Sequence, residues 1–110
     1  MLDPVAAADA FTALAHPVRR RVLDLLAEGE RSAGELSAGF AISRPAVSQH
    51  LRILLDAGLV ASRHSGREHV YRLRPEGMRQ VDDWLGHYRR FWDGRLERLE
   101  RYLDTEERRS

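Results

Sequence analysis

The feature of the sequence that most constrains the fold is the stretch ISRPAVSQHLRILLDAGLV, which spans residues 42–60. Ser43 is of a type that favours the N-cap of a helix, Pro45 suits the first turn, and Gly58 suits the end. The stretch therefore predicts one short, largely apolar helix that begins and ends abruptly and continues directly into a strand. A helix this apolar is expected to pack against a core.

A second short helix is predicted directly before this stretch. Ser32 and Glu35 form the capping-box pattern S-x-x-E, which begins a helix that stops near Gly39. Only the four residues 40–43, FAIS, separate the two helices. Two short helices joined by such a tight turn are typical of a helix-turn-helix.

The second of these helices has two chemically different faces. At about 100° per residue, the face expected to be buried carries Val47, Leu51, Leu54 and Leu55. The opposite face and its flank carry Pro45, Ser48, Gln49 and Arg52. These polar groups can bond base edges in the major groove, and no carboxylate in the first three turns repels phosphate. An ordinary solvent-exposed face is the alternative interpretation.

Residues 59–74 predict a β-hairpin. Strands over residues 59–65 and 68–74 flank Gly66 and Arg67, and a glycine at the first central position suits a type II′ turn. With this loop, one side pairs Val60 with Leu73, Ser62 with Tyr71 and His64 with His69, and the other pairs Ala61 with Arg72 and Arg63 with Val70. The apolar base of the first side is expected to pack on the core. The arginine side and Arg67 then stay free for a phosphate backbone, with a plain solvated hairpin as the alternative.

Two more helices are predicted before the helix-turn-helix. The first spans residues 5–14, with Asp3 as N-cap and Pro4 at the first helical position. The second spans residues 17–28 and is ended by Gly29. With a long terminal helix, the sequence predicts about five helices and one small β-hairpin, which is a mainly α fold.

The terminal helix is predicted from residue 75 to about residue 103. Apolar side chains recur along it at steps of three and four: Met78, Val81, Leu85, Tyr88, Trp92, Leu96, Leu99 and Leu103. A body of about 75 residues is too small to cover this stripe, so its far half is expected to pack on a second chain. The expected dimerisation residues are Leu85, Tyr88, Trp92, Leu96 and Leu99. A pocket for an apolar effector among the aromatic residues Trp84, Tyr88, Phe91 and Trp92 is the alternative.

The length of 110 residues fits one domain. We expect a DNA-binding domain over residues 1–74, a dimerisation helix of the same compact domain over residues 75–104, and a frayed tail over residues 105–110. The absence of cysteine excludes disulfides and thiolate metal sites. No signal peptide or transmembrane segment is recognisable, which favours a soluble, cytoplasmic protein.

The net charge of +1 conceals an uneven distribution of charge. All 18 basic residues are arginine, which a GC-rich genome would explain, but whose planar guanidinium also suits phosphate or guanine. Between residues 44 and 74, only Asp56 and Glu68 oppose the basic residues Arg44, Arg52, Arg63, Arg67, Arg72 and Arg74. An enzyme is not expected, because no glycine-rich phosphate loop, metal-ligand constellation or nucleophile arrangement is recognisable.

Three motifs, LAHPVRRRVLDLL, SRPAVSQHLRILLDAGLV and SGREHVYRL, occur in this order within residues 11–73. In combination they resemble the ArsR family of small bacterial winged helix-turn-helix regulators. The resemblance implies a homodimer that binds an operator with inverted half-sites in double-stranded DNA, usually represses a small operon and is released by a signal. It also implies that the second helix lies at the DNA groove and that Arg67 is at the tip of a two-stranded wing. The residues expected at the DNA are Ser43, Arg44, Pro45, Ser48, Gln49, Arg52, Arg63, Arg67 and Arg72.

The sequence departs from the metal-sensing members of that family. Members that sense arsenic, cadmium or lead commonly use cysteines, and this chain has none. Asp83 and His87 form one pair of potential zinc ligands and His64 and His69 another, but neither pair fills a tetrahedral site. We therefore expect no metal site, no cofactor and a non-metal signal, and a small-molecule effector stays open. His50 is interpreted as a helix-packing or phosphate-bonding residue.

A second interpretation keeps the fold but not the DNA. In it, the chain is a winged-helix module that contacts other proteins through the same surface. Such a module would favour an apolar or acidic outer face on residues 43–57, whereas this face is polar and basic. DNA binding is therefore the preferred interpretation.

Overall fold

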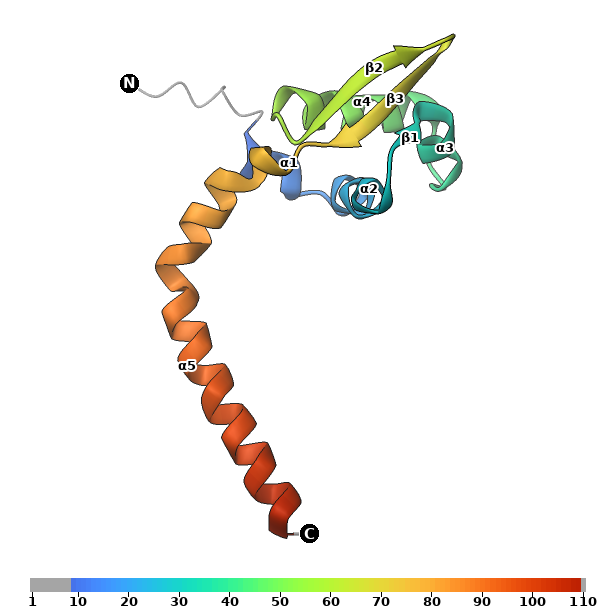
Figure 1. The fold of residues 1–110 in the computed structure, drawn as a ribbon. Coiled ribbons are helices and arrows are strands. Elements are labelled where there is room, and N and C mark those ends of the chain that lie inside the picture. The colour runs from blue at the N-terminus through green and yellow to red at the C-terminus, as the bar shows by residue number, and fades with distance from the viewer. Residues whose placement is uncertain (1–8, 110) are drawn as a thin grey trace, which may run out of the picture. The chain divides into compact units, whose positions relative to one another are not determined.

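The computed structural model of the chain describes residues 9–109. Its elements, in chain order, are α1 (Ala10–Leu14), α2 (Pro17–Glu28), β1 (Arg31–Ser32), α3 (Ala33–Ala38), α4 (Arg44–Asp56), β2 (Val60–Ser65), β3 (Glu68–Leu73), the 3-10 helix η1 (Pro75–Met78) and α5 (Arg79–Arg109) (Figure 1). By its contacts the chain divides into two units that meet between Arg79 and Gln80. The sequence analysis places the terminal helix in the same compact domain as the rest of the chain. The division into two units arises because the contacts along a single long helix are mostly local.

The first two helices begin at side-chain caps. α1 begins at Ala10 because the Asp9 carboxylate accepts a hydrogen bond from the backbone N–H of Thr12 at 2.8 Å. The predicted N-cap at Asp3 and the predicted start at residue 5 lie outside the described residues. α2 has its predicted bounds, and the His16 imidazole accepts from the backbone N–H of Val18 at 3.1 Å.

The helix-turn-helix has the boundaries that its capping residues predict. The Ser32 hydroxyl accepts from the Glu35 N–H at 3.1 Å, and the Glu35 carboxylate accepts from the Ser32 N–H at 3.0 Å, which confirms the capping box of α3. Ser43 caps α4 through the Ala46 N–H at 3.3 Å. α4 ends in a Schellman motif: Gly58 has a φ of +77°, and the Leu59 N–H bonds the Leu54 carbonyl at 3.1 Å.

The predicted hairpin is part of a three-stranded antiparallel sheet with the order β1-β3-β2. All five predicted pairs of β2 and β3 are present, from Val60 with Leu73 to His64 with His69. Gly66 has a φ of +64° and Arg67 has a negative φ, as a type II′ turn requires. The predicted two-stranded wing is confirmed, and the sheet adds the strand β1, whose two residues are too few to show a periodicity in the sequence.

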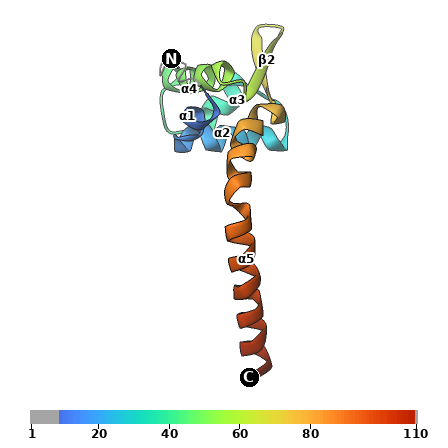
Figure 2. The same cartoon turned by 90° about the vertical axis from the view of Figure 1, so that its left-hand side faces the viewer.

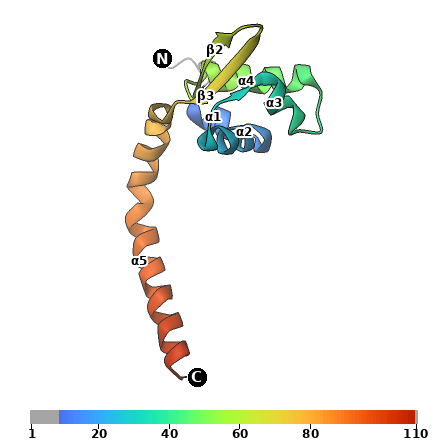
Figure 3. The ribbon, with the colours of Figure 1, turned by 45° about the vertical axis from the view of Figure 1, so that its right-hand side comes forward.

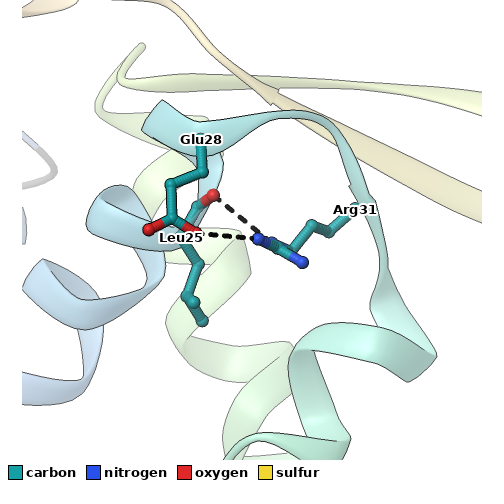
Figure 4. A network of polar contacts seen from close by, with 3 residues as sticks. All are labelled: Leu25, Glu28 and Arg31. Carbon is teal, nitrogen blue, oxygen red and sulfur yellow. Dashed lines mark hydrogen bonds and ion pairs between the residues drawn. The ribbon is translucent and has the colours of Figure 1, made fainter.

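Arg31 anchors β1 to the end of α2. Its Nη2 lies 3.1 Å from the Glu28 carboxylate, and its Nε donates to the Leu25 carbonyl at 3.3 Å (Figure 4). Leu25 is in the last turn of α2, where carbonyl groups have no partner within the helix and a cation is favourable. This contact directs the chain from α2 to the side of β3, where Arg31 is opposite Tyr71.

The core of the first unit lies where α1 to α4 meet the base of the hairpin, and α4 lies along β2 (Figures 1 and 3). Its buried apolar side chains are Ala10, Ala13, Val22, Leu23, Leu26, Leu36, Val47, Leu51, Leu54, Leu59, Val60 and Tyr71. The predicted buried face of α4 is confirmed except at Leu55, which is only partly buried. Val60 and Tyr71 complete the core from the sheet, as the predicted register requires.

The second unit is one continuous helix, α5 (Figure 2). It begins after the 3-10 turn η1 and continues beyond the predicted end near residue 103 to Arg109. The arginine and glutamate residues beyond Asp104 are good helix formers, which explains the longer helix. Eight of its large apolar side chains are between 44% and 61% exposed: Trp84, Tyr88, Phe91, Trp92, Leu96, Leu99, Tyr102 and Leu103. No helix within residues 9–109 is long and apolar enough to cross a membrane.

Candidate nucleic-acid interface

The outer face of α4 is the centre of the candidate interface. Every side chain predicted to contact DNA from this region is exposed: Ser43, Arg44, Pro45, Ser48, Gln49 and Arg52. The buried residues Val47, Leu51 and Leu54 occupy the opposite face and hold the helix against the core. α4 therefore presents hydroxyl, amide and guanidinium groups to solvent from a rigid helix.

An open cleft of about 500 Å³ separates this face of α4 from the hairpin. Ser48, Gln49, Arg52 and Leu55 line it from α4, and Ser62, His69 and Tyr71 line it from the strands. The half-buried Leu55 and the buried Tyr71 supply apolar surface, and the remaining side chains supply hydrogen-bond donors and acceptors. Such a cleft can hold an extended polar chain between the helix and the wing.

The hairpin side that faces this cleft is not the side that the sequence favours for DNA. Ser62 and His69 line the cleft, whereas Arg63 is on the opposite side of the strands. Arg63 is also not free, because its guanidinium forms an ion pair with Glu30 at 2.7 Å. Arg72, also exposed, shares the side of Arg63, and Arg67 is exposed at the tip. This ion pair corrects the prediction of a free arginine side for Arg63 alone, and the DNA contacts of Arg63 and Arg72 stay predictions.

Strand alternation places Ser62 and His69 on one side of the predicted hairpin, but only the packing of the hairpin beside α4 shows that this side faces the cleft. Both are on the strand side that packs on the core at its base, through Val60 and Tyr71. The hairpin extends beyond the core, so the same side becomes solvent-exposed toward the tip, beside α4. We therefore add Ser62 and His69 to the candidate interface.

Arg52 has a carboxylate partner on its own helix. Its Nε lies 3.3 Å from the Asp56 carboxylate, and the two side chains are 77% and 48% exposed. An exposed i,i+4 pair on a helix contributes only about 0.3–0.5 kcal/mol. Arg52 can therefore exchange Asp56 for a nucleic-acid group at little cost.

The histidines do not form a metal cluster with other ligand residues. His64 and His69 face each other across the hairpin, with ring centroids 4.2 Å apart. Within residues 9–109 there is no group of three or more histidine, cysteine, aspartate or glutamate residues that could hold a metal ion. Asp83 and His87 are exposed on α5.

The inner side of α4 has a polar contact that the sequence analysis missed. His50 contacts the guanidinium of Arg19, whose exposed fraction is only 8%, and its ring lies against the ring of His16 with centroids 4.3 Å apart and planes tilted by 46°. Burial, the nearby His16 and the nearby Arg19 lower the pKa of His50. The prediction that His50 packs between helices agrees with this position.

Three comparisons place the chain among known proteins. Residues 14–63 match the model of a helix-turn-helix domain family. The HTH-type transcriptional regulator Rv2034 of Mycobacterium tuberculosis is 40% identical over 97 residues, which are 88% of this chain and 88% of that protein. The transcriptional repressor SdpR of Bacillus subtilis is 35% identical over 75 residues, which are 68% of this chain and 83% of that protein.

A solved structure also resembles this chain and is that of a transcriptional regulator. The crystal structure of the ArsR family transcriptional regulator RHA00566 matches with a TM-score of 0.71 and 29% identity, over 84% of this chain and 95% of that chain. From its sequence relatives and its winged fold, this chain belongs to the ArsR family of helix-turn-helix transcriptional regulators.

Proposed function

We propose that this chain is a homodimeric repressor that binds an inverted-repeat operator in double-stranded DNA in the cytoplasm. The observation that carries the proposal is the outer face of α4, which is exposed, polar and acid-free over its first three turns and continues into the cleft. Family membership supports a transcriptional regulator, and the name of SdpR supports repression.

In this proposal α4 enters the major groove. Gln49 and Arg52 point outward from the middle of α4 and contact base edges, because amide and guanidinium groups can form paired hydrogen bonds to bases. Ser43 and Arg44 contact the phosphates that border the groove, since they lie at the N-terminus of α4, and Ser48 lines its flank.

The DNA strand that borders the groove enters the cleft between α4 and the hairpin. Ser62 and His69 are placed to bond its phosphates, and Arg67 and Arg72 add positive charge from the wing. Arg63 is on the other side of the hairpin, where it forms an exposed ion pair with Glu30.

We assign the contact with a second copy of the chain to the apolar stripe of α5. Eight large apolar side chains of α5 are about half exposed, which favours a partner that covers them, and a homodimer would place two copies of α4 on one operator. Leu85, Tyr88, Trp92, Leu96 and Leu99 are the proposed interface residues. The releasing signal is proposed to be a non-metal effector.

Sequencing of the genomic DNA fragments retained by the purified protein at about 0.15 M salt tests the proposal. We expect enrichment of an inverted repeat whose half-sites are about one helical turn apart, 34–36 Å. A Gln49→Ala, Arg52→Ala double variant is the matched control and should lose the enrichment while remaining folded. Uniform recovery of all fragments by the wild type would refute the operator and favour the protein-interaction module.

A further inference from the structure

Arg19 joins three helices from a nearly buried position. Its Nε donates to the Ala13 carbonyl at 2.8 Å and its Nη2 to the Thr12 carbonyl at 3.0 Å, both in α1. Its Nη1 lies 3.2 Å from Nδ1 of His50 in α4. One guanidinium of α2 therefore holds the end of α1 and the middle of α4 together.

The chemistry of this contact decides the protonation state of His50. A guanidinium has only donors, so Nδ1 of His50 must accept, and the ring must be neutral with its proton on Nε2. The charged or titratable groups that act on the ring are His16, which precedes α2, and Arg19 of α2. α1 contributes only backbone carbonyls to the contact with Arg19. Both neighbouring groups are basic, so a cationic His50 has no favourable partner among them.

We propose that Arg19 and His50 position α4, the helix that contacts base edges in the proposed function. In this inference, protonation of His50 releases α4 and weakens DNA binding in acid. The inference rests on the proposed DNA-binding function. A proton on Nδ1 replaces the acceptor by a donor that faces the N–H of Arg19, and it places two cations at hydrogen-bond distance. The contact then opens, and the neighbouring residue Gln49 and nearby Arg52 move with the helix.

The direction of the pH dependence follows because only neutral His50 can accept the hydrogen bond from Arg19. The lowered pKa of folded His50 means that the unfolded chain takes up the proton first as the pH falls below 6.5. The contribution of this contact to stability is therefore full above pH 6.5 and is lost as the pH falls from 6.5 through the folded pKa. Operator affinity depends on the folded chain alone, so it should decrease at lower pH, as the pH approaches and passes the folded pKa of His50.

The test compares wild type with His50→Gln, because a glutamine carbonyl can accept from Arg19 but does not titrate. Affinity for an operator fragment selected at pH 7.5 is measured at pH 7.5 and pH 5.5. One linked proton predicts that wild type loses more affinity than His50→Gln over this interval, by at most about tenfold for each pH unit below the folded pKa of His50. His87→Gln on α5 is the control and should behave as wild type. Effects of the wing histidines cancel, because all three proteins retain them.

A second measurement does not involve DNA. The melting temperature of wild type should decrease more than that of His50→Gln between pH 7.5 and 5.5. An equal decrease in both proteins, or an equal loss of operator affinity, would overturn the inference. If wild type selects no operator at pH 7.5, the proposed function fails, and the melting comparison still tests the Arg19–His50 contact.

Discussion

Gln49 and Arg67 differ in what their positions allow them to contact on DNA. Gln49 points outward from the middle of α4, and Arg67 is at the tip of the hairpin, beyond the cleft. We expect Gln49→Ala to lose about 1–3 kcal/mol of discrimination at one base position. Arg67→Ala should weaken binding to all sequences alike and reduce the salt slope by about one unit. Competition binding across operator variants and salt concentrations measures both. A change of sequence preference in Arg67→Ala at constant salt slope would contradict the wing assignment.

Gly77 is required where η1 approaches the end of α4. A Cβ at this position would lie 2.9 Å from the carbonyl carbon of Gly58 and 3.1 Å from Cα of Leu59, and even closer to the Gly58 carbonyl oxygen. These neighbours are backbone atoms that follow α4, so they cannot rotate away. We expect Gly77→Ala to lower the free energy of unfolding by about 1–3 kcal/mol, as measured by urea denaturation.

Gly86 is the matched control for this substitution. It lies within α5, and a Cβ there would have no heavy atom within 4 Å apart from its chain neighbours and the nearby backbone of its own helix. Gly86→Ala should therefore increase helix stability by about 1 kcal/mol. Equal stability of Gly77→Ala and wild type would mean that η1 does not pack tightly on the end of α4.

At the scale of the element, the start of α3 depends on the charge of Glu35. Hydrogen bonds from the backbone and the side chain of Ser32 lower the pKa of Glu35. The folded pKa lies below the ordinary 4.5, so the stabilisation is present above pH 4.5 and is lost as the pH falls through the folded pKa. The melting temperature of wild type should therefore decrease in this window.

Glu35→Gln separates this charge from the hydrogen bond of the capping box. Glutamine can still accept from the Ser32 N–H, but it does not titrate. The variant should be less stable than wild type at pH 7 and should approach it near pH 3. A constant difference at both pH values would show that the charge of Glu35 does not stabilise α3.

At the scale of the whole molecule, selection of an operator depends on two recognition helices. A single α4 makes too few base contacts for a selective site, so a dimer must hold two of them one helical turn apart. Trp92 and Leu96 are 50% and 56% exposed in the apolar stripe of α5, and truncating a large interface anchor commonly costs about 2 kcal/mol or more. We expect Trp92→Ala with Leu96→Ala to shift the dimer toward monomer in sedimentation experiments and to abolish specific operator binding.

The control for this double variant is on the same helix. Glu97→Ala with Arg101→Ala removes an exposed ion pair at 4.0 Å, about 140–180° around α5 from Trp92, and should leave both properties unchanged. A folded, monomeric Trp92→Ala, Leu96→Ala variant with wild-type operator affinity would refute the dimer interface and the two-half-site mechanism.

Local signals in the sequence were sufficient for most element boundaries. The capping box of Ser32 and Glu35, the cap at Ser43 and the terminal Gly58 act within a few residues of the helix ends that they define. The type II′ turn at Gly66 likewise determines every pair of the hairpin. These features follow from short-range sterics and hydrogen bonds, so they can be predicted without knowledge of the fold. The outward position of Gln49 follows from the helical period in the same way.

Contacts between distant residues were decided only by the tertiary structure. Arg19 and His50 are 31 positions apart, and Glu30 and Arg63 are 33 positions apart. No periodicity relates such residues, and an arginine in a helix is expected to be exposed until the fold supplies buried acceptors for its donors. The cleft also combines α4 with two strands, so the contribution of His69 becomes visible only when the hairpin lies beside the helix. Chain connectivity determines the caps and the register, whereas packing determines which polar groups meet.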